Sequence, residues 1–215
     1  MKRVVITGMG TGSPIGTNVE DFWGNLRDGN TGVAPITRFD ASQTGVSVAA
    51  EVKDFDPTLT MDRKEYKRMD LFSQYGVAAS VEAHKMSGYD IEANAHRVGV
   101  LVSSGIGGLV EIENGIRKMI SKGPKRVPPL FVPLTIGNMG AGNISMKLGA
   151  KGVSLDIVTA CASATNSIGE AFLKIQAGLL DAAFAGGAEG TINEIGIAGF
   201  AALTALSTNE DPKTA

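Results

Sequence analysis

The sequence predicts an α/β fold in which a parallel or mixed sheet is covered by helices. Short apolar runs alternate along the chain with longer stretches of helical periodicity, which is the pattern of strands connected through helices. Residues 153–189 carry a complete strand, helix and strand, and crossovers of this kind join parallel strands. Glycine accounts for 28 of the 215 residues and aromatic residues for only 6%, so we expect close backbone approach to organise the interior.

The first half of the chain predicts one strand and two helices. Residues 3–7 are rich in Val and Ile and end at a glycine, which indicates a buried strand. Residues 17–20 have capping-box spacing before a helix that ends at Gly29. After a loop-like stretch to residue 59, apolar residues at helical spacing predict a single helix over residues 62–86.

The second half predicts two central strands, at residues 98–103 and 153–158, with two helices between them. The first of these helices, residues 111–122, is amphipathic, whereas the second, residues 134–148, contains three glycines. Each glycine costs roughly 1 kcal/mol of helix propensity relative to alanine. Either another element packs closely against these glycines, or the segment is irregular.

The strand of residues 153–158 begins the βαβ unit. Apolar residues then recur at helical spacing over residues 164–175, and Glu170 and Lys174 pair one turn apart on the polar face. Gly178 ends this helix, and residues 181–185 form the next strand, which opens on Gly-Gly-Ala-Glu.

Charge and composition exclude several classes of function. The 20 Lys and Arg residues against 22 Asp and Glu give a formal net charge of -2, so no global field attracts nucleic acid or an anionic membrane. One cysteine excludes a disulfide framework and a multi-cysteine zinc site, and the glycines from Gly8 to Gly12 lack the spacing of a dinucleotide fingerprint. Neither a signal-peptide core nor a membrane-spanning apolar run is found. We therefore expect a cytoplasmic protein with no cofactor and no metal.

Cys161 lies where a predicted strand ends and a predicted helix begins. A lone cysteine between two alanines is most often a buried small hydrophobic residue. The start of a helix, however, offers free backbone N–H groups and the positive end of the helix dipole, which favour a thiolate and can stabilise an oxyanion. Small neighbours leave room for a substrate carbon beside the sulfur. This arrangement suits thioester exchange.

Six motifs carry a resemblance to a known family. They are VVITGMG at the start of the chain, SSGIGG, FVPLTIGNM, IVTACASATNSIGEA, AGGAE and GFAALTALST, and they follow one another over nearly the whole sequence. In this order they resemble the N-terminal half of the β-ketoacyl-[acyl carrier protein] synthases, among which synthase II is most similar.

The resemblance implies a thiolase-like fold with layered αβα architecture and a homodimer, in which residues 1–215 form the N-terminal domain and the C-terminal half is absent. It implies that Cys161 accepts an acyl chain from acyl carrier protein as a thioester. Malonyl-[acyl carrier protein] then loses CO2 and its enolate attacks this thioester, which lengthens the chain by two carbons in fatty-acid synthesis. The Cys161 N–H is expected to be one oxyanion donor.

Other site residues follow from the same resemblance. Phe200 matches a gating position beside the cysteine and Ile106 matches a position that lines the acyl tunnel, with ordinary core packing as the alternative for both. Basic residues that match a docking site for acyl carrier protein are Lys64, Lys67 and Arg68, for which a solvated helix face is the alternative. Thr204 stands where related synthases often have an arginine, and we interpret the second basic cluster, Lys122, Lys125 and Arg126, as a solvated surface.

The family's two catalytic histidines and lysine belong to the C-terminal half. His84 and His96 match no catalytic position, and the final residues, LSTNEDPKTA, read as a loop in a chain that is cut off. We therefore expect the isolated chain to be inactive in condensation and to associate through exposed apolar surface. The alternatives are a non-catalytic partner subunit of a condensing complex, although such subunits replace the cysteine, and a thiolase or polyketide ketosynthase.

Overall fold

The computed structural model describes residues 2–215, which divide into two compact units. The first unit contains the chain up to Gly10 together with Pro57–Gly190, and the second contains Thr11–Asp56 and Thr191–Ala215. None of the described helices has the length and hydropathy needed to cross a membrane.

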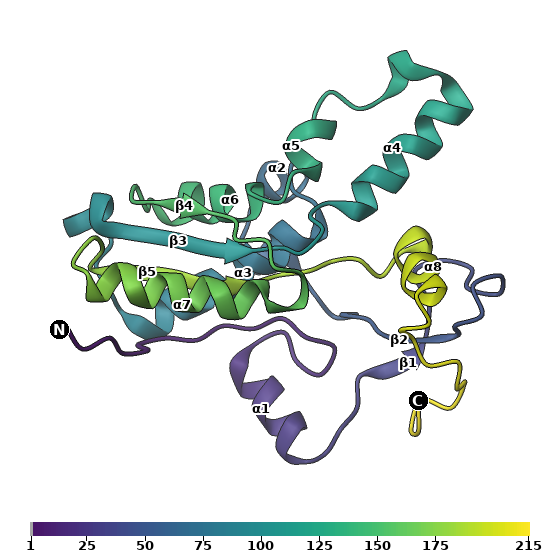
Figure 1. The fold of residues 1–215 in the computed structure, drawn as a ribbon, viewed down its shortest axis with the longest axis horizontal. Coiled ribbons are helices and arrows are strands. Elements are labelled where there is room, and N and C mark those ends of the chain that lie inside the picture. The colour runs from purple at the N-terminus through teal and green to yellow at the C-terminus, as the bar shows by residue number, and fades with distance from the viewer. Residues whose placement is uncertain (1) are drawn as a thin grey trace. The chain divides into compact units, whose positions relative to one another are not determined.

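The first unit is built around a three-stranded parallel sheet (Figure 1). Its central strand β3 (Val98–Ser103) pairs with β4 (Ser154–Leu155) on one side and with β5 (Ala182–Gly187) on the other. Helix α7 (Ser163–Gln176) connects β4 to β5 and packs on β3 and β5. The predicted parallel βαβ unit is thus confirmed.

Strand β4 is shorter than the predicted strand over residues 153–158. After Leu155 the backbone leaves the ladder, because the Ile157 N–H donates to Ser103 Oγ at 2.7 Å and the Asp156 carboxylate accepts from the Ser104 N–H at 3.1 Å. These contacts tie the segment before Cys161 to the end of β3.

Helices cover both faces of β3, all six residues of which are buried. Leu101 packs in one core cluster with Ala171 of α7 and with Leu180. On the other face, α6 (Met139–Leu148) packs on β3 and on α3 (Leu71–Ser87). Because successive side chains of a strand point to opposite faces, β3 contributes to both layers, which agrees with the αβα architecture.

The predicted helix over residues 62–86 is two helices, α2 (Arg63–Tyr66) and α3. A capping box of Asp62 and Glu65 begins α2, and the Asp70 carboxylate begins α3 by accepting from the Phe72 N–H. The prediction of one helix was wrong because an apolar period continues across the break, whereas the second acidic cap starts a new helix.

The predicted glycine-rich helix over residues 134–148 is also divided, into α5 (Phe131–Thr135) and α6. Gly137 lies in the break, where a Cβ would be only 2.3 Å from Asp156 Oδ2. Gly140 lies within α6, where a Cβ would be 3.1 Å from the Phe72 ring. The segment is therefore both irregular and closely packed. Helix α4 (Leu109–Lys122) begins two residues before the predicted start.

The predicted strand over residues 3–7 was wrong. These residues belong to no strand, and Val5 and Ile6 are exposed. The following glycines lie against α3 instead, since a Cβ on Gly8 would be 2.1 Å from the Ala83 carbonyl oxygen. The glycines of this segment thus serve contact with a helix backbone.

The second unit contains α1 (Val19–Arg27), an antiparallel pair of β1 (Val33–Pro35) with β2 (Val48–Ala50), and α8 (Glu194–Ala202). The first helix was predicted, but its cap is Asn18, one residue later than the predicted capping box. The β1–β2 pair lies in the stretch predicted as a loop. In the first unit, short 3-10 turns occupy Pro57–Leu59, Glu92–Arg97, Pro124–Arg126 and Ala160–Ala162.

Candidate active site

Cys161 is an exposed free thiol in the 3-10 turn that precedes α7. The residue before it, Ala160, has a φ of 52°, which is the left-handed region and costs a residue with a Cβ about 1–2 kcal/mol. The Ser163 hydroxyl holds this conformation by donating to the Ala160 carbonyl at 2.7 Å and accepting from the Thr159 N–H at 2.9 Å. Cys161 is therefore presented on a strained turn that α7 itself braces.

Further hydrogen bonds fix this turn to the sheet. The Asn166 amide of α7 donates to Thr159 Oγ1 at 2.9 Å. One turn of helix away from Ser163, the fully buried Ser167 hydroxyl meets Ser103 Oγ at the end of β3, 2.7 Å away. The position of Cys161 thus depends on β3 and α7 together, as the βαβ prediction requires.

The amino end of α7 is open toward Cys161. Its N-cap residue, Ala162, makes no side-chain capping bond, so the first-turn N–H groups and the positive end of the helix dipole are not neutralised by a capping side chain. Within the described chain, the Cys161 N–H also has no hydrogen-bond acceptor. The oxyanion of a thioester carbonyl can be stabilised at this position.

The loop after β3 brings Ile106 to the same region. The adjacent Gly105 lies so near the Cys161 turn that a Cβ on it would be 3.5 Å from the Ala160 carbonyl oxygen. Ile106 itself is 43% exposed. The structure therefore places the loop of one predicted tunnel residue beside the turn of the predicted nucleophile.

Two carboxylates hold this loop. Glu189 Oε2, just after β5, accepts from the Gly105 N–H at 3.0 Å and from the Ile106 N–H at 3.2 Å, while Asp156 accepts from the Ser104 N–H. Desolvation raises the pKa of both carboxyls above their ordinary values. For Glu189 this reflects the surroundings of the carboxyl group, since the residue as a whole is exposed.

Sequence reasoning missed both carboxylates as site residues. Asp156 fell inside the predicted strand of residues 153–158, and Glu189 fell in the segment that follows the predicted strand of residues 181–185. In the structure Asp156 directly follows β4, and Glu189 lies two residues after the end of β5. Parallel strands that flank one central strand end at the same edge of the sheet, so residues that follow them meet there.

The remaining predicted residues belong to other elements of the structure. Phe200 belongs to α8 in the second unit and is 38% exposed, and Thr204 follows α8 with a φ of 55°. His84 of α3 packs edge-on against Phe184, with ring centroids 6.2 Å apart, and His96 lies in a 3-10 turn. No described contact joins either histidine to the Cys161 turn. Within the described chain, no three His, Cys, Asp or Glu side chains gather in a way that suits a metal ion.

The basic residues form two exposed sets. Lys64 belongs to α2, and Lys67 and Arg68 follow directly after it. This short helix is anchored by Glu65, which accepts from Lys147 Nζ of α6 at 2.8 Å. The predicted docking residues therefore stand on a fixed element.

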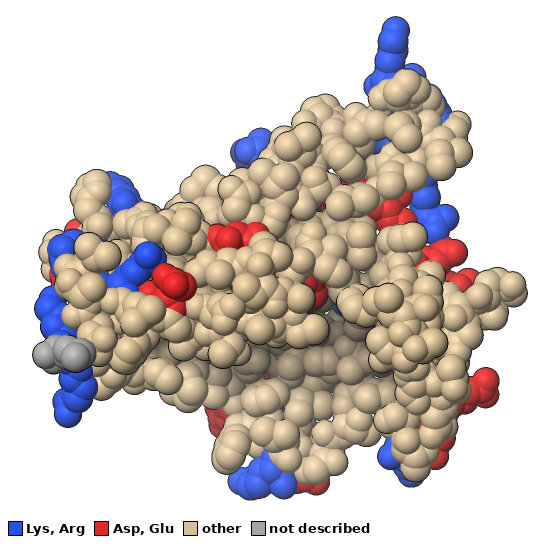
Figure 2. All heavy atoms as spheres, in the orientation of Figure 1, with Lys and Arg blue, Asp and Glu red and all other residues tan. Residues whose placement is uncertain are grey.

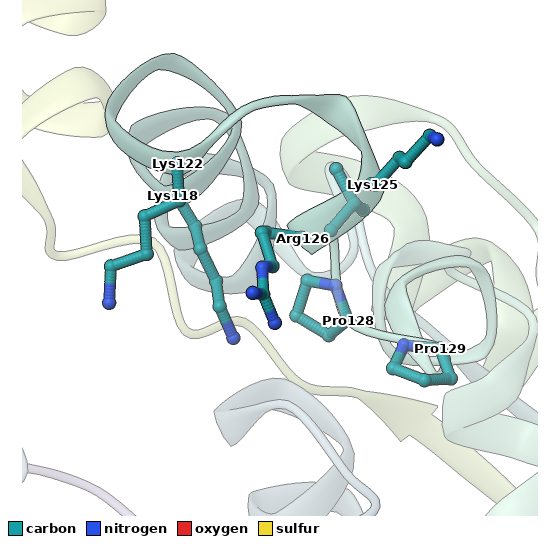
Figure 3. Close-up of a pocket in the computed structure, with 7 residues that line it drawn as sticks. Lys118, Lys122, Lys125, Arg126, Pro128 and Pro129 are labelled. Carbon is teal, nitrogen blue, oxygen red and sulfur yellow. The ribbon is translucent and has the colours of Figure 1, made fainter.

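The second basic set, Lys118, Lys122, Lys125 and Arg126, lines a surface pocket at the carboxyl end of α4 (Figure 3). Figure 3 shows Lys118, Lys122 and Arg126 extending to one side, while Lys125 points away. Figure 2 shows Lys and Arg side chains gathered at this end of the unit. Val127, Pro128 and Pro129 complete the lining. Sequence analysis interpreted three of these cations as a solvated surface, and the structure adds Lys118 and the hollow between them.

Comparison with known proteins agrees with this geometry. The chain is 49% identical over 215 residues to 3-oxoacyl-[acyl-carrier-protein] synthase 2 of Staphylococcus aureus (strain COL), covering 100% of this chain and 52% of the relative. The chain thus spans about half the length of the curated relatives it matches.

Solved structures give the same fold. The ishigamide ketosynthase/chain length factor superposes with a TM-score of 0.90 at 30% identity, over 97% of this chain and 52% of that one. A type II polyketide ketosynthase with its acyl-carrier protein, AntDE:AntF, superposes with a TM-score of 0.79 at 23% identity, over 93% of this chain and 54% of that one. These structures place the chain in the thiolase-like fold, as predicted from the sequence motifs.

The description of the family domain that matches this chain is "Beta-ketoacyl synthase, N-terminal domain", and the match extends over residues 1–215. Taken with the cysteine turn at the amino end of α7 and the thiolase-like fold, this match means that the chain belongs to the β-ketoacyl synthase family.

Proposed function

We propose that the protein is a 3-oxoacyl-[acyl-carrier-protein] synthase of fatty-acid elongation, a transferase that uses Cys161 as its nucleophile. The observation that carries this proposal is the braced turn that presents an exposed thiol beside the uncapped end of α7. The 49% identity to a synthase of this name supports the same substrate class.

In the first half-reaction the Cys161 sulfur attacks the carbonyl carbon of an acyl thioester. The bond from that carbon to the carrier sulfur breaks, the carrier leaves as a thiol, and the acyl group remains on Cys161. The Cys161 N–H and the first turn of α7 stabilise the oxyanion that forms on the way. Ile106 lines the path of the acyl chain, and a gating role for Phe200 follows from the family resemblance alone.

In the second half-reaction a malonyl thioester loses CO2, and the carbanion that remains attacks the acyl carbonyl. The carbon to sulfur bond to Cys161 breaks and the sulfur takes up a proton from water, which leaves a 3-oxoacyl chain on the carrier. The developing enolate oxygen needs hydrogen-bond donors, which are worth roughly 3 kcal/mol or more in transition-state energy. We propose that a C-terminal half supplies them, so that residues 1–215 alone can be acylated but do not condense.

The partner in both half-reactions is acyl carrier protein, which we propose docks on Lys64, Lys67 and Arg68. Complementary charge of this kind accelerates association and weakens with salt. The solved polyketide ketosynthase in complex with its acyl-carrier protein provides a precedent among proteins of this fold.

We further propose a cytoplasmic homodimer. Three large apolar side chains of α7 are partly exposed, Ile168 by 52%, Phe172 by 42% and Leu173 by 53%, and a surface of this kind favours association. Sedimentation of the full-length protein tests the stoichiometry, and a monomer at micromolar concentration would contradict it.

The decisive experiment is acylation of the full-length protein by a long-chain acyl-carrier thioester, followed by peptide mass spectrometry. We expect the acyl adduct on the Cys161 peptide and its complete loss in C161A. In the absence of acyl donor, Cys161 should react with iodoacetamide much faster than a model thiol and resist once acylated. An unacylated wild-type protein would instead favour the second candidate, a non-catalytic partner subunit, against which the retained cysteine argues.

A further inference from the structure

The Glu189 carboxylate receives an unusual number of donors from one neighbouring loop. Its Oε2 accepts from the Gly105 and Ile106 N–H groups, and its Oε1 accepts from the Ser104 hydroxyl at 3.2 Å. A fourth donor, the Gly190 N–H, reaches Oε1 at 3.3 Å. We propose that Glu189 is a positioning residue for acyl transfer, which holds the loop of residues 104–106 in the place that lets a long acyl chain reach Cys161. This proposal rests on the proposed function.

The chemistry of the contact requires a carboxylate. All four partners donate, and an ionised carboxylate is the side-chain group that accepts at both of its atoms. Glutamine in the same place offers one oxygen, so its NH2 group would face a backbone N–H. If this NH2 group takes the Oε2 place, the Gly105 and Ile106 N–H groups lose their acceptor. If it takes the Oε1 place, it faces the Gly190 N–H, and the two loop bonds lose the negative charge that strengthens them. Either orientation holds the loop less firmly on its β5 side.

Other hydrogen bonds also hold this loop, but they involve residues on either side of Gly105 and Ile106. The Ser104 N–H is held by Asp156, and the Gly107 N–H donates back to Ser104 Oγ at 2.8 Å. Beyond it, the Gly108 N–H donates to the carbonyl of Thr135 at 3.0 Å. None of these bonds reaches the peptide groups of Gly105 and Ile106, which Glu189 alone fixes among the described side chains.

One of these two residues, Gly105, adjoins the turn that carries the nucleophile. Gly105 faces the Ala160 carbonyl, in the strained turn next to Cys161. Ile106 is the neighbouring side chain and is partly exposed. A chain that leaves the Cys161 sulfur along this loop passes Ile106, whereas a two-carbon group ends before it. Misplacement of the loop should therefore penalise long acyl groups more than short ones.

The chain offers a matched control in the second unit. Glu51 accepts from two backbone N–H groups and one hydroxyl, the kinds of donor that the loop of residues 104–106 presents to Glu189. These donors are the N–H groups of Thr37 and Arg38 and the hydroxyl of Thr37, at 3.0, 3.1 and 2.6 Å. It is 2% exposed, so E51Q should cost at least as much stability as E189Q. A merely structural role for Glu189 predicts that the two variants behave alike toward substrates.

The test measures acylation of Cys161 in the full-length wild type, E189Q and E51Q, with a long acyl and an acetyl donor on the same carrier protein. We expect E189Q to lower the ratio of long-chain to acetyl rate constants by about 10- to 100-fold, in the range that a displacement of 1 Å produces. The ratio in E51Q should remain that of the wild type, while thermal unfolding reports the stability of each variant.

An unchanged ratio in E189Q would overturn the inference. If E189Q does not fold, G105A replaces it, because a Cβ there would press on Glu189 Oε2 at 3.3 Å without removing the carboxylate. We then expect G105A to lower the ratio of long-chain to acetyl rate constants in the same way, and an unchanged ratio in G105A would also refute the inference. A wild type that neither donor acylates would refute the proposed function instead, which separates the two failures.

Discussion

The Asp70 carboxyl makes the stability of the first unit depend on pH in a direction opposite to that of most acidic residues. It is 3% exposed and caps two helices at once, accepting from the Phe72 N–H at the start of α3 and from the Glu111 N–H in the first turn of α4. Burial raises its pKa from 3.8 to about 6, with a smaller contribution from the Glu111 charge, against the lowering effect of its hydrogen bonds. The folded state therefore holds this proton more tightly than the unfolded state.

The sign of the effect follows from proton linkage. Because the pKa is higher in the folded state, the contribution of Asp70 is most favourable below pH 4 and is lost as the pH rises to about 6. The shift corresponds to at most about 3 kcal/mol in the free energy of unfolding. In D70N the group no longer titrates, and the amide oxygen still accepts one of the two N–H groups.

The assay is urea unfolding of the full-length wild type and of D70N at several values between pH 4 and pH 7. We expect the wild type to lose about 2–3 kcal/mol relative to D70N over this interval. Other carboxyls titrate in both proteins and cancel in the difference. A difference that stays constant from pH 4 to pH 7 would refute the reasoning, because it would mean that Asp70 ionises alike in both states.

The remaining predictions concern the glycines and the basic helix. G142A should stabilise α6 by about 0.5–1 kcal/mol, since its Cβ would meet only the Met139 sulfur at 3.7 Å. G137A should instead lower the free energy of unfolding by about 1–3 kcal/mol, because the Asp156 carboxylate occupies the space that its Cβ needs. Equal unfolding midpoints for the two variants would contradict both predictions. The double variant K67E/R68E should slow acylation by the carrier protein at low salt and flatten its salt dependence, and an unaltered salt slope would place docking elsewhere. K147M should cost no more than about 1 kcal/mol in thermal unfolding, because the ion pair with Glu65 is partly exposed, yet it should slow carrier association by loosening α2, which stopped-flow fluorescence can measure.

The sequence was most informative where local pattern and packing agree. Strand β3 has the predicted bounds, and the start of α7 lies next to Cys161 as expected. Both elements could be predicted because a buried strand and an amphipathic helix each leave a pattern within a short continuous stretch of sequence. Residues 3–7 failed for the opposite reason. Their apolar content was read as burial in a sheet, but the glycines that follow bind the segment to α3, and no local pattern reveals which backbone a glycine will approach.

The carboxylates of the site could not be assigned from sequence because their partners are distant. Glu189 acts on peptide groups more than 80 residues before it, and Asp156 acts on the end of β3. Peptide N–H groups look the same at every position of a sequence. Only the parallel order of β4, β3 and β5 shows that these carboxylates meet one loop.

That order has a practical consequence. Strands β4 and β5 each pair with β3 alone among the described strands, so the outer row of peptide groups on each is available to another extended chain. The two-residue β4 offers almost no template, whereas β5 offers six residues without a charge or a proline. Strand addition along β5 is therefore the route by which concentrated samples of this unit should begin to aggregate, and a lysine placed on that strand should delay it.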